Sequence, residues 1–477
     1  MTSRGRSAVR VQIACLLAAC ALSGCVFKQS EEGGPYSGEL DPEAAGGPTC
    51  DPTAVIDPGG RALLVTEPEA LAELPLEDVL SKLLEASGDT STTPLELFQR
   101  MFDTNNREGA SVYPDGMHCD SAENPAHANG PAAFCPRGEG ALAASDGVFT
   151  PGHPDHFRPV AVVNRMDLEG SNPFTCGEAR ILYAKESGLT DPEDRVFLMF
   201  EVSVPQPNEP SECLSLARWW KDLEDVPRAE EVARELRSFF FDAPPDMTPL
   251  LHPANLGLGS TGGGGYYGQT GQLRVSQHMD EHWEMRQLVA SMQDESRLRF
   301  VPTTVGNNPM PGLFDPKLND SSDAEFALDF AERNVGRLAV SELEGMTMDV
   351  PPEHLSGESA LGGEAINDYA ARGAANSFLL DVIALRIEEL GLGAGCPEDD
   401  PLTPDSILRR ATMDSCAGCH APARFLGPER EIGCGLTWPA SLGEVHIDES
   451  GRLSPALTEV FLPQRAALLT EVIRTCP

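Results

Sequence analysis

The stretch RVFLMFEVSV, residues 195–204, is the clearest indicator of the fold. It is rich in β-branched and aromatic residues, which fit a pleated and partly buried strand. Two similar runs precede it at 158–168 and 179–185, and turn-forming residues separate the three runs. The sequence therefore predicts an antiparallel meander, with further strands at 272–277 and 284–290.

Apolar residues at helical spacing flank this meander on both sides. Residues 75–87 and the segment that opens at Thr93-Pro94 precede it, and residues 213–224 and 228–241 follow its first strands. From Ala324 onward the pattern is mostly helical. We therefore expect the α+β class: an antiparallel-sheet domain with flanking helices at 61–320, and a smaller, mostly helical C-terminal domain at 321–477.

The N-terminus has the pattern of an export signal. Three arginines, Arg4, Arg6 and Arg10, precede a short apolar run at 11–22. The following Leu22-Ser23-Gly24-Cys25 resembles a bacterial lipobox, in which Cys25 becomes the lipidated first residue. We expect a signal peptide at 1–24, a flexible tether at 25–60, and a lipid bilayer as partner through the Cys25 anchor.

The residue after Cys25 bears on localisation. It is Val26 and not aspartate, which favours the outer membrane over the inner membrane in the envelope of a Gram-negative-type bacterium. The chain has 35 basic and 74 acidic residues and a formal net charge of −39. Such a charge disfavours nucleic acid and anionic lipid surfaces as partners.

The chain has 13 cysteines, of which Cys15 and Cys20 leave with the signal and Cys25 takes the lipid. The remaining even number, in an oxidising compartment, indicates disulfide bonds. Proximity in the sequence predicts the pairs Cys119–Cys135 and Cys176–Cys213, and a pair between Cys476 and either Cys434 or Cys396.

A C-x-x-C-H motif, Cys416-Ala417-Gly418-Cys419-His420, lies near the C-terminus. This motif is the attachment site of a c-type haem: the two thiols bond the porphyrin vinyl groups and the imidazole ligates iron. We predict haem c on Cys416 and Cys419, with His420 as axial ligand, at the end of a helix that begins at Thr403-Pro404. Two alternatives are a disulfide with an incidental histidine, and a zinc site that also uses Cys434 and a histidine.

The second axial ligand is less clear from the sequence. No methionine follows Met413, so His446 in Val445-His446-Ile447 is the later residue of the right type. The alternative for His446 is a half-buried histidine bonded to a carboxylate such as Asp448. An iron with five ligands would leave a site for peroxide or another small molecule.

Several further short motifs lie outside the C-x-x-C-H segment. They are residues 164–168 (NRMDL), 176–180 (CGEAR), 271–274 (GQLR), 283–286 (WEMR), 445–447 (VHI) and 453–457 (LSPAL). Together with residues 415–420 they resemble a group of secreted or lipidated bacterial proteins of unassigned function whose C-terminus is similar to a c-type cytochrome. The resemblance spans about 95–477 and implies a shared fold and a haem, without a known reaction.

The central motifs place alternating charges on predicted strands. One interpretation is structural, in which arginine–carboxylate pairs fix the register of the strands. The other is a polar cleft that binds an anionic group. The residues concerned are Arg165, Asp167, Glu178, Arg180, Arg274, Glu284 and Arg286.

Other motifs carry less information. His278 and His282 could share a helical face, but Met279 stands where a zinc protease needs glutamate. His153-x-x-His156 lies between prolines. The match of 257–262 to G-x-G-x-x-G lacks a preceding strand, which favours a loop. The sequence contains neither a nucleophile elbow nor a P-loop.

The sequence thus supports two hypotheses, and catalytic residues are assigned in neither. The first is an exported, membrane-tethered lipoprotein with one covalent haem that exchanges electrons with a redox partner protein. The alternative is a non-enzymatic binding or structural lipoprotein without haem, held together by five disulfides.

Overall fold

The structure is a computed structural model in which Pro48–Pro477 form one compact unit. The predicted signal peptide and Cys25 lie outside the described residues. No helix within the described part of the chain is long and apolar enough to cross a membrane. The structure describes residues 50–124, 134–171, 175–205, 211–242, 249–258, 271–279, 282–294, 296–316, 321–363 and 366–475.

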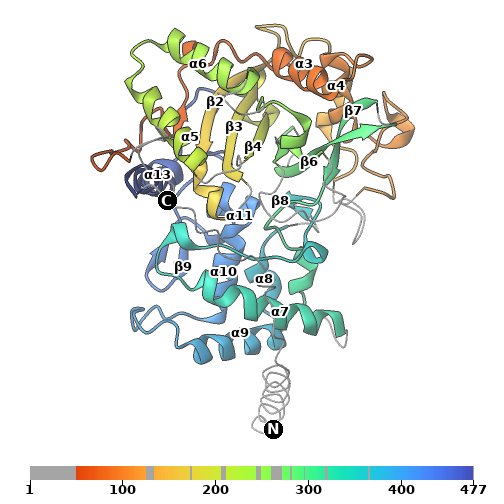
Figure 1. The fold of residues 1–477 in the computed structure, drawn as a ribbon. Helices are drawn as coiled ribbons and strands as arrows, with labels where there is room; N and C mark the ends of the chain where they lie inside the picture. Colours follow the sequence, from red (N-terminus) through yellow and green to blue (C-terminus); the bar gives the residue numbers. More distant parts are fainter. Residues whose placement is uncertain are drawn as a thin grey trace, which may run out of the picture. The chain divides into compact units, whose positions relative to one another are not determined.

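An antiparallel sheet forms the centre of the molecule (Figure 1). Its strands follow the order β1-β2-β3-β4-β5-β6-β7, and β8 also pairs with β6. This confirms the predicted meander and the α+β class. The strands are β1 (Leu64–Val65), β2 (Phe157–Arg165), β3 (Thr175–Lys185), β4 (Val196–Pro205), β5 (Gln272–Gln277), β6 (Glu284–Gln293), β7 (Arg297–Thr303) and β8 (Ser359–Ala360).

The helices that precede and interrupt the meander follow the predicted spacing. Thr93 caps the helix that opens at Pro94, because its hydroxyl accepts a hydrogen bond from the Glu96 amide at 3.1 Å. Phe98 of this helix packs on Phe157 at a ring-centroid distance of 5.2 Å. The helices are α2 (Pro68–Leu71), α3 (Leu76–Ser87), α4 (Pro94–Asp103), α5 (Ser211–Asp222) and α6 (Ala229–Phe241).

The C-terminal region is mainly helical, as predicted. In Figure 1, α7 to α10 form a layer beside the sheet, and α11, which carries the C-x-x-C-H motif, lies between this layer and the sheet. The elements are α7 (Ser321–Leu338), α8 (Tyr369–Gly373), α9 (Ser377–Leu390), α10 (Pro404–Asp414), α11 (Cys416–His420), α12 (Pro422–Leu426), β9 (Glu431–Gly433), β10 (Leu436–Thr437) and α13 (Leu462–Thr475).

Residues 50–60, the last part of the predicted tether, are packed against this helical region. Ala54 and Ile56 are buried in the core. The Arg474 side chain donates to the Ala54 carbonyl, and the Asp51 amide donates to the Ile473 carbonyl. The ordered domain therefore begins before residue 61, because this segment supplies apolar side chains that cover α13.

The structure contains three disulfides between described cysteines. Cys119–Cys135 and Cys176–Cys213 are as predicted. The third joins Cys396 to Cys434, so the prediction that one of these pairs with Cys476 is wrong. The reason is that β9 packs on α10, which brings the β9–β10 turn next to the segment after α9 and the two Cα atoms to 4.6 Å. Cys476 itself lies outside the described residues.

Candidate functional site

A cavity of about 470 Å³ lies against one face of the sheet, a size typical of sites for small molecules and cofactors. Side chains of β2 to β6 form its floor. Because successive side chains of a strand point to opposite faces of the sheet, every second residue of these strands faces the cavity. Cross-strand register makes Arg180 the neighbour of Glu201, and Met199 the neighbour of Arg274. The floor residues are Val163, Arg165, Arg180, Leu182, Phe197, Met199, Glu201, Arg274, Ser276 and Met285.

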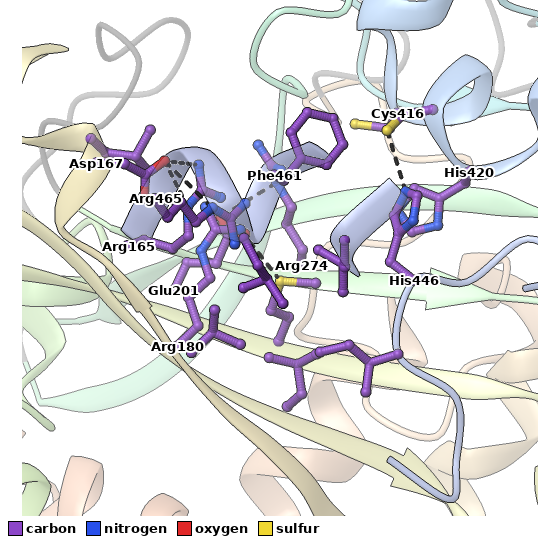
Figure 2. Close-up of a pocket in the computed structure, with 18 of the residues that line it drawn as sticks. Arg165, Asp167, Arg180, Glu201, Arg274, Cys416, His420, His446, Phe461 and Arg465 are labelled. Carbon is purple, nitrogen blue, oxygen red and sulfur yellow. Dashed lines mark hydrogen bonds and ion pairs between the residues drawn. The ribbon is translucent and has the colours of Figure 1, made fainter. Parts of the chain in front are cut away.

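The opposite wall comes from the C-terminal region. It consists of α11, residues 445–447, the π-helical turn Ala456–Phe461 and the first half of α13. Cys416, Cys419, His420 and His446 all line the cavity, so the structure brings together four of the predicted site residues. Figure 2 shows this group on one side of the cavity.

The backbone of the motif is held in a tight turn. The sequence predicted that the motif ends the preceding helix, but α10 stops at Asp414 and Ser415 caps a separate short helix, α11. A Cβ on Gly418 would lie 1.8 Å from the Thr412 carbonyl oxygen, so only glycine fits there. The relative position of the two cysteines is therefore set by the main chain.

His420 is oriented by two contacts. Its Nδ1 donates to the Glu444 carbonyl at 2.8 Å, and its ring stacks on Trp283 at a centroid distance of 5.0 Å. The bonded Nδ1–H makes Nε2 the nitrogen with a free lone pair. Burial lowers the pKa of His420 to about 4, so the imidazole is neutral at physiological pH, which is the form that ligates metals.

His446 has a similar arrangement. Its Nδ1 is 2.9 Å from Ser454 Oγ, and its Nε2 is 3.3 Å from Cys419 Sγ. Asp448 bonds instead to Ser450 and Arg452, so the structure does not show the alternative of a His446–Asp448 pair. Burial lowers the pKa of His446 well below its ordinary value, which keeps this ring neutral as well.

The two imidazole rings lie close together, with centroids 4.7 Å apart. A metal–imidazole bond is about 2 Å long, so two axial imidazoles on one iron hold their centroids about 6 Å apart. His420 and His446 would therefore have to separate before both could ligate one iron. In this structure the ring of His420 is already oriented by the Glu444 carbonyl and by Trp283.

Cys416 and Cys419 differ from the other described cysteines. They are free thiols, whereas Cys50, Cys119, Cys135, Cys176, Cys213, Cys396 and Cys434 are all in disulfides. Burial raises the pKa of Cys416, and raises that of Cys419 to about 12. Both are therefore protonated at neutral pH, which makes them poor nucleophiles and slow in thiol–disulfide exchange. Because Cys434 is bonded to Cys396, the zinc alternative loses one of its ligands.

Four arginines line the other side of the cavity (Figure 2). Arg165 donates hydrogen bonds to both carboxylate oxygens of Asp167. Arg180 lies between Glu178 and Glu201 and pairs with both. The other two are Arg274 from β5, which is 3.5 Å from Glu201, and Arg465 from α13, which is 3.7 Å from Asp167.

The charged residues of the strand motifs lie on two different faces of the sheet, because successive residues of a strand point to opposite faces. Arg165, Arg180 and Arg274 face the cavity, whereas Glu284 and Arg286 flank Met285 and face the opposite side of the sheet. There they form a buried cluster with Arg137 and Glu139. The structural interpretation therefore fits the closed face, and the anion-binding interpretation stays a prediction for the face that borders the cavity.

Among the cavity residues that were not singled out from the sequence, Glu201 and Arg465 are the two that join the arginine–carboxylate pairs. Each is a charged residue inside an otherwise apolar stretch, which is the signal that could have identified it. Their contact with the other arginines depends on the register of the sheet and on the docking of α13, which a single sequence does not specify.

The structure does not bring the other histidine pairs of the sequence together as metal ligands within the described residues. His278 follows β5 directly, so His278 and His282 do not share a helix. His278 Nε2 is 3.3 Å from Ser276 Oγ, and His278 Nδ1 is 3.6 Å from Glu444. His153 and His156 lie in turns before β2, and 259–270 of the glycine-rich loop lie outside the described residues. The described residues contain no group of three or more His, Cys, Asp or Glu that could hold a metal ion.

Comparisons with known proteins found no matching family model, no matching curated protein and no matching solved structure. The resemblance stated from the short motifs therefore stays a prediction. The functional argument depends on the cavity and its residues alone.

Proposed function

We propose that this protein is an exported, lipid-anchored electron-transfer protein that carries one covalently attached haem c. Cys416 and Cys419 would form the thioether bonds, and His420 would ligate the iron. The observation that carries the proposal is that the two thiols of C-x-x-C-H are free and line one cavity with neutral imidazoles, while the other described cysteines are in disulfides. The residues present fit a haem.

The chain's own residues would prepare this site before the cofactor arrives. The Glu444 carbonyl and the Trp283 ring hold His420 with Nε2 directed away from the backbone. Apolar side chains of the floor, among them Leu182, Phe197 and Met199, would give a bound cofactor an apolar surface to pack on. When bound, the haem would supply one-electron exchange at a potential set by its axial ligands and its surroundings.

The proposal also includes the anchor at Cys25, a place in the cell envelope with the outer membrane favoured, and a redox partner protein. His446 is proposed as a second axial ligand that would move away from His420 on binding. Electron transfer is the default function for an iron with two side-chain ligands, because it leaves no open position for a substrate.

Expression of the full chain with haem-maturation machinery tests this function. We expect a covalent haem signal on a denaturing gel and the added mass of one haem, both absent from the Cys416→Ser/Cys419→Ser variant. His446→Ala should convert a low-spin absorption spectrum to a high-spin one. A wild-type protein that acquires no haem under these conditions would refute the proposal.

The second candidate is a haem-free binding lipoprotein. The observation that favours it is the combination of three disulfides with an arginine-lined cavity that could take an anionic ligand. Native protein that contains two free thiols and has no visible absorption would support this candidate. Its five-disulfide form does not match the free Cys416 and Cys419.

A further inference from the structure

The arginine side of the cavity holds four guanidinium groups close to one another. Asp167 pairs with both Arg165 and Arg465, and Glu201 pairs with both Arg180 and Arg274. All four arginine side chains are 11–16% exposed. Carboxylates stabilise like charges that are held together at this depth.

Arg465 is the member with the weakest partner. Its Nε is 3.7 Å from Asp167 Oδ2, but Arg165 already binds both oxygens of that carboxylate at 2.9 Å. Burial, followed by the positive charges of Arg165 and Arg180, lowers the pKa of Arg465 to about 9. The guanidinium group of Arg465 therefore lies where an additional carboxylate would stabilise it.

The two sides of the cavity differ in chemistry, as the two edges of a haem do. The porphyrin carries its vinyl groups on two adjacent pyrrole rings and its two propionate carboxylates on the other two. In Figure 2 the cysteines lie on one side of the cavity and the arginines on the other, with Phe461 between them. Apolar side chains of β2 to β6 lie beneath both.

We propose that Arg465, together with Arg274, binds the propionate carboxylates of the haem. This inference rests on the proposed function. It assigns the carboxylate site to the sheet and α13, outside the segment that carries C-x-x-C-H, so that the cofactor would join two parts of the chain. Arg465 is thus a ligand-binding residue, and its present contact with Asp167 is secondary.

The test is a comparison of Arg465→Gln in two backgrounds, the haem-loaded full chain and the haem-free Cys416→Ser/Cys419→Ser chain. With haem, the variant should unfold at a lower urea concentration and have a lower midpoint reduction potential, because a positive charge next to the propionates is lost. Without haem, it should be as stable as its parent or more stable, since repulsion from Arg165 and Arg180 is relieved. Arg465→Lys should restore most of the potential.

The matched control is Arg474→Gln, which removes the same charge from the same helix outside the cavity. If Arg465→Gln does not fold, Arg465→Met replaces it. Equal destabilisation in both backgrounds, with a potential like that of Arg474→Gln, would show a purely structural arginine. That result overturns this inference and leaves the haem proposal standing. A wild type that acquires no haem overturns both.

Discussion

Two arginine–carboxylate clusters lie on opposite faces of one sheet, and they differ in what surrounds them. Arg137, Glu139, Glu284 and Arg286 form a closed cluster in which every side chain is at most 7% exposed. The arginines of the cavity cluster border an open volume instead. The same residue types therefore form a closed ion-pair cluster on one face of the sheet and line a cavity on the other. The face on which a residue lies depends on its odd or even position along the strand.

The clusters also shift their carboxylates in opposite directions. Burial raises the pKa of Glu284 in the closed cluster to about 8. In the cavity cluster, Arg165 and then Arg465 outweigh the burial of Asp167 and lower its pKa to about 2. Glu284 thus favours the protonated form, whereas Asp167 favours the charged one.

The largest effect is expected from opening the closed cluster. Glu139 accepts two hydrogen bonds from Arg137 and one from the Met279 amide. Glu139→Ala leaves a buried guanidinium group without its main partner, and should lower the free energy of unfolding by about 3–5 kcal/mol. Urea unfolding at pH 7 measures this loss. A loss below that of Asp167→Asn would contradict the assignment of this cluster as the structural one.

Glu284 should give the closed cluster a characteristic pH dependence. Because its pKa is higher in the folded chain than its unfolded value near 4.5, its contribution to stability is complete below that pH and is lost as the pH rises through about 8. Glu284→Gln should reduce the decline in unfolding free energy between pH 5 and pH 9. Parallel curves for wild type and variant would exclude this carboxyl group as the cause.

The cavity cluster should show the opposite sign with a smaller effect. Asp167→Asn removes a charge-assisted pair and should cost about 2 kcal/mol at pH 7. Since the pKa of Asp167 is depressed to about 2, the wild-type advantage is present above pH 4 and is lost as the pH falls through 2. Unfolding at pH 7 and pH 3 checks this. An advantage that grows in acid would contradict the assignment.

The smallest change in unfolding free energy is expected for a solvent-exposed ion pair. Arg409 and Asp405 pair at i, i+4 on α10, where both side chains are more than 40% exposed. Arg409→Gln should change the unfolding free energy by less than about 0.5 kcal/mol, because solvent screens the pair. A larger change would mean that the hydrogen bond from Arg409 to the Glu431 carbonyl contributes to the free energy of unfolding.

Local patterns were sufficient for much of the fold. The helix at Pro94 was predicted from Thr93 and the apolar spacing behind it, and the Cys176–Cys213 pair from proximity alone. β7 was not predicted, since Pro302 argues against a strand, yet β7 lies at the end of the strand order, where a proline is tolerated. Cys396–Cys434 depends on the docking of β9 against α10, which no local signal reports.

The site was predicted only in part. The sequence identified Cys416, Cys419, His420 and His446 by type and spacing, and the structure brings their side chains to one cavity. The position of Arg465 next to Asp167 could not be predicted, since it requires α13 to pack against the turn Met166–Ser171 that follows β2. Residues that a local motif identifies were therefore predicted. Residues whose contacts depend on segments distant in the sequence were missed.

The position of α13 has a consequence for how the protein is made. The strands of the floor are synthesised first, the two thiols much later, and Arg465 and Leu468 later still. A nascent chain that has just exposed the thiols therefore lacks one wall of its pocket, and the segment at 50–56 must wait for the same helix to cover it. The pocket is therefore complete only after the chain has been synthesised through residue 468.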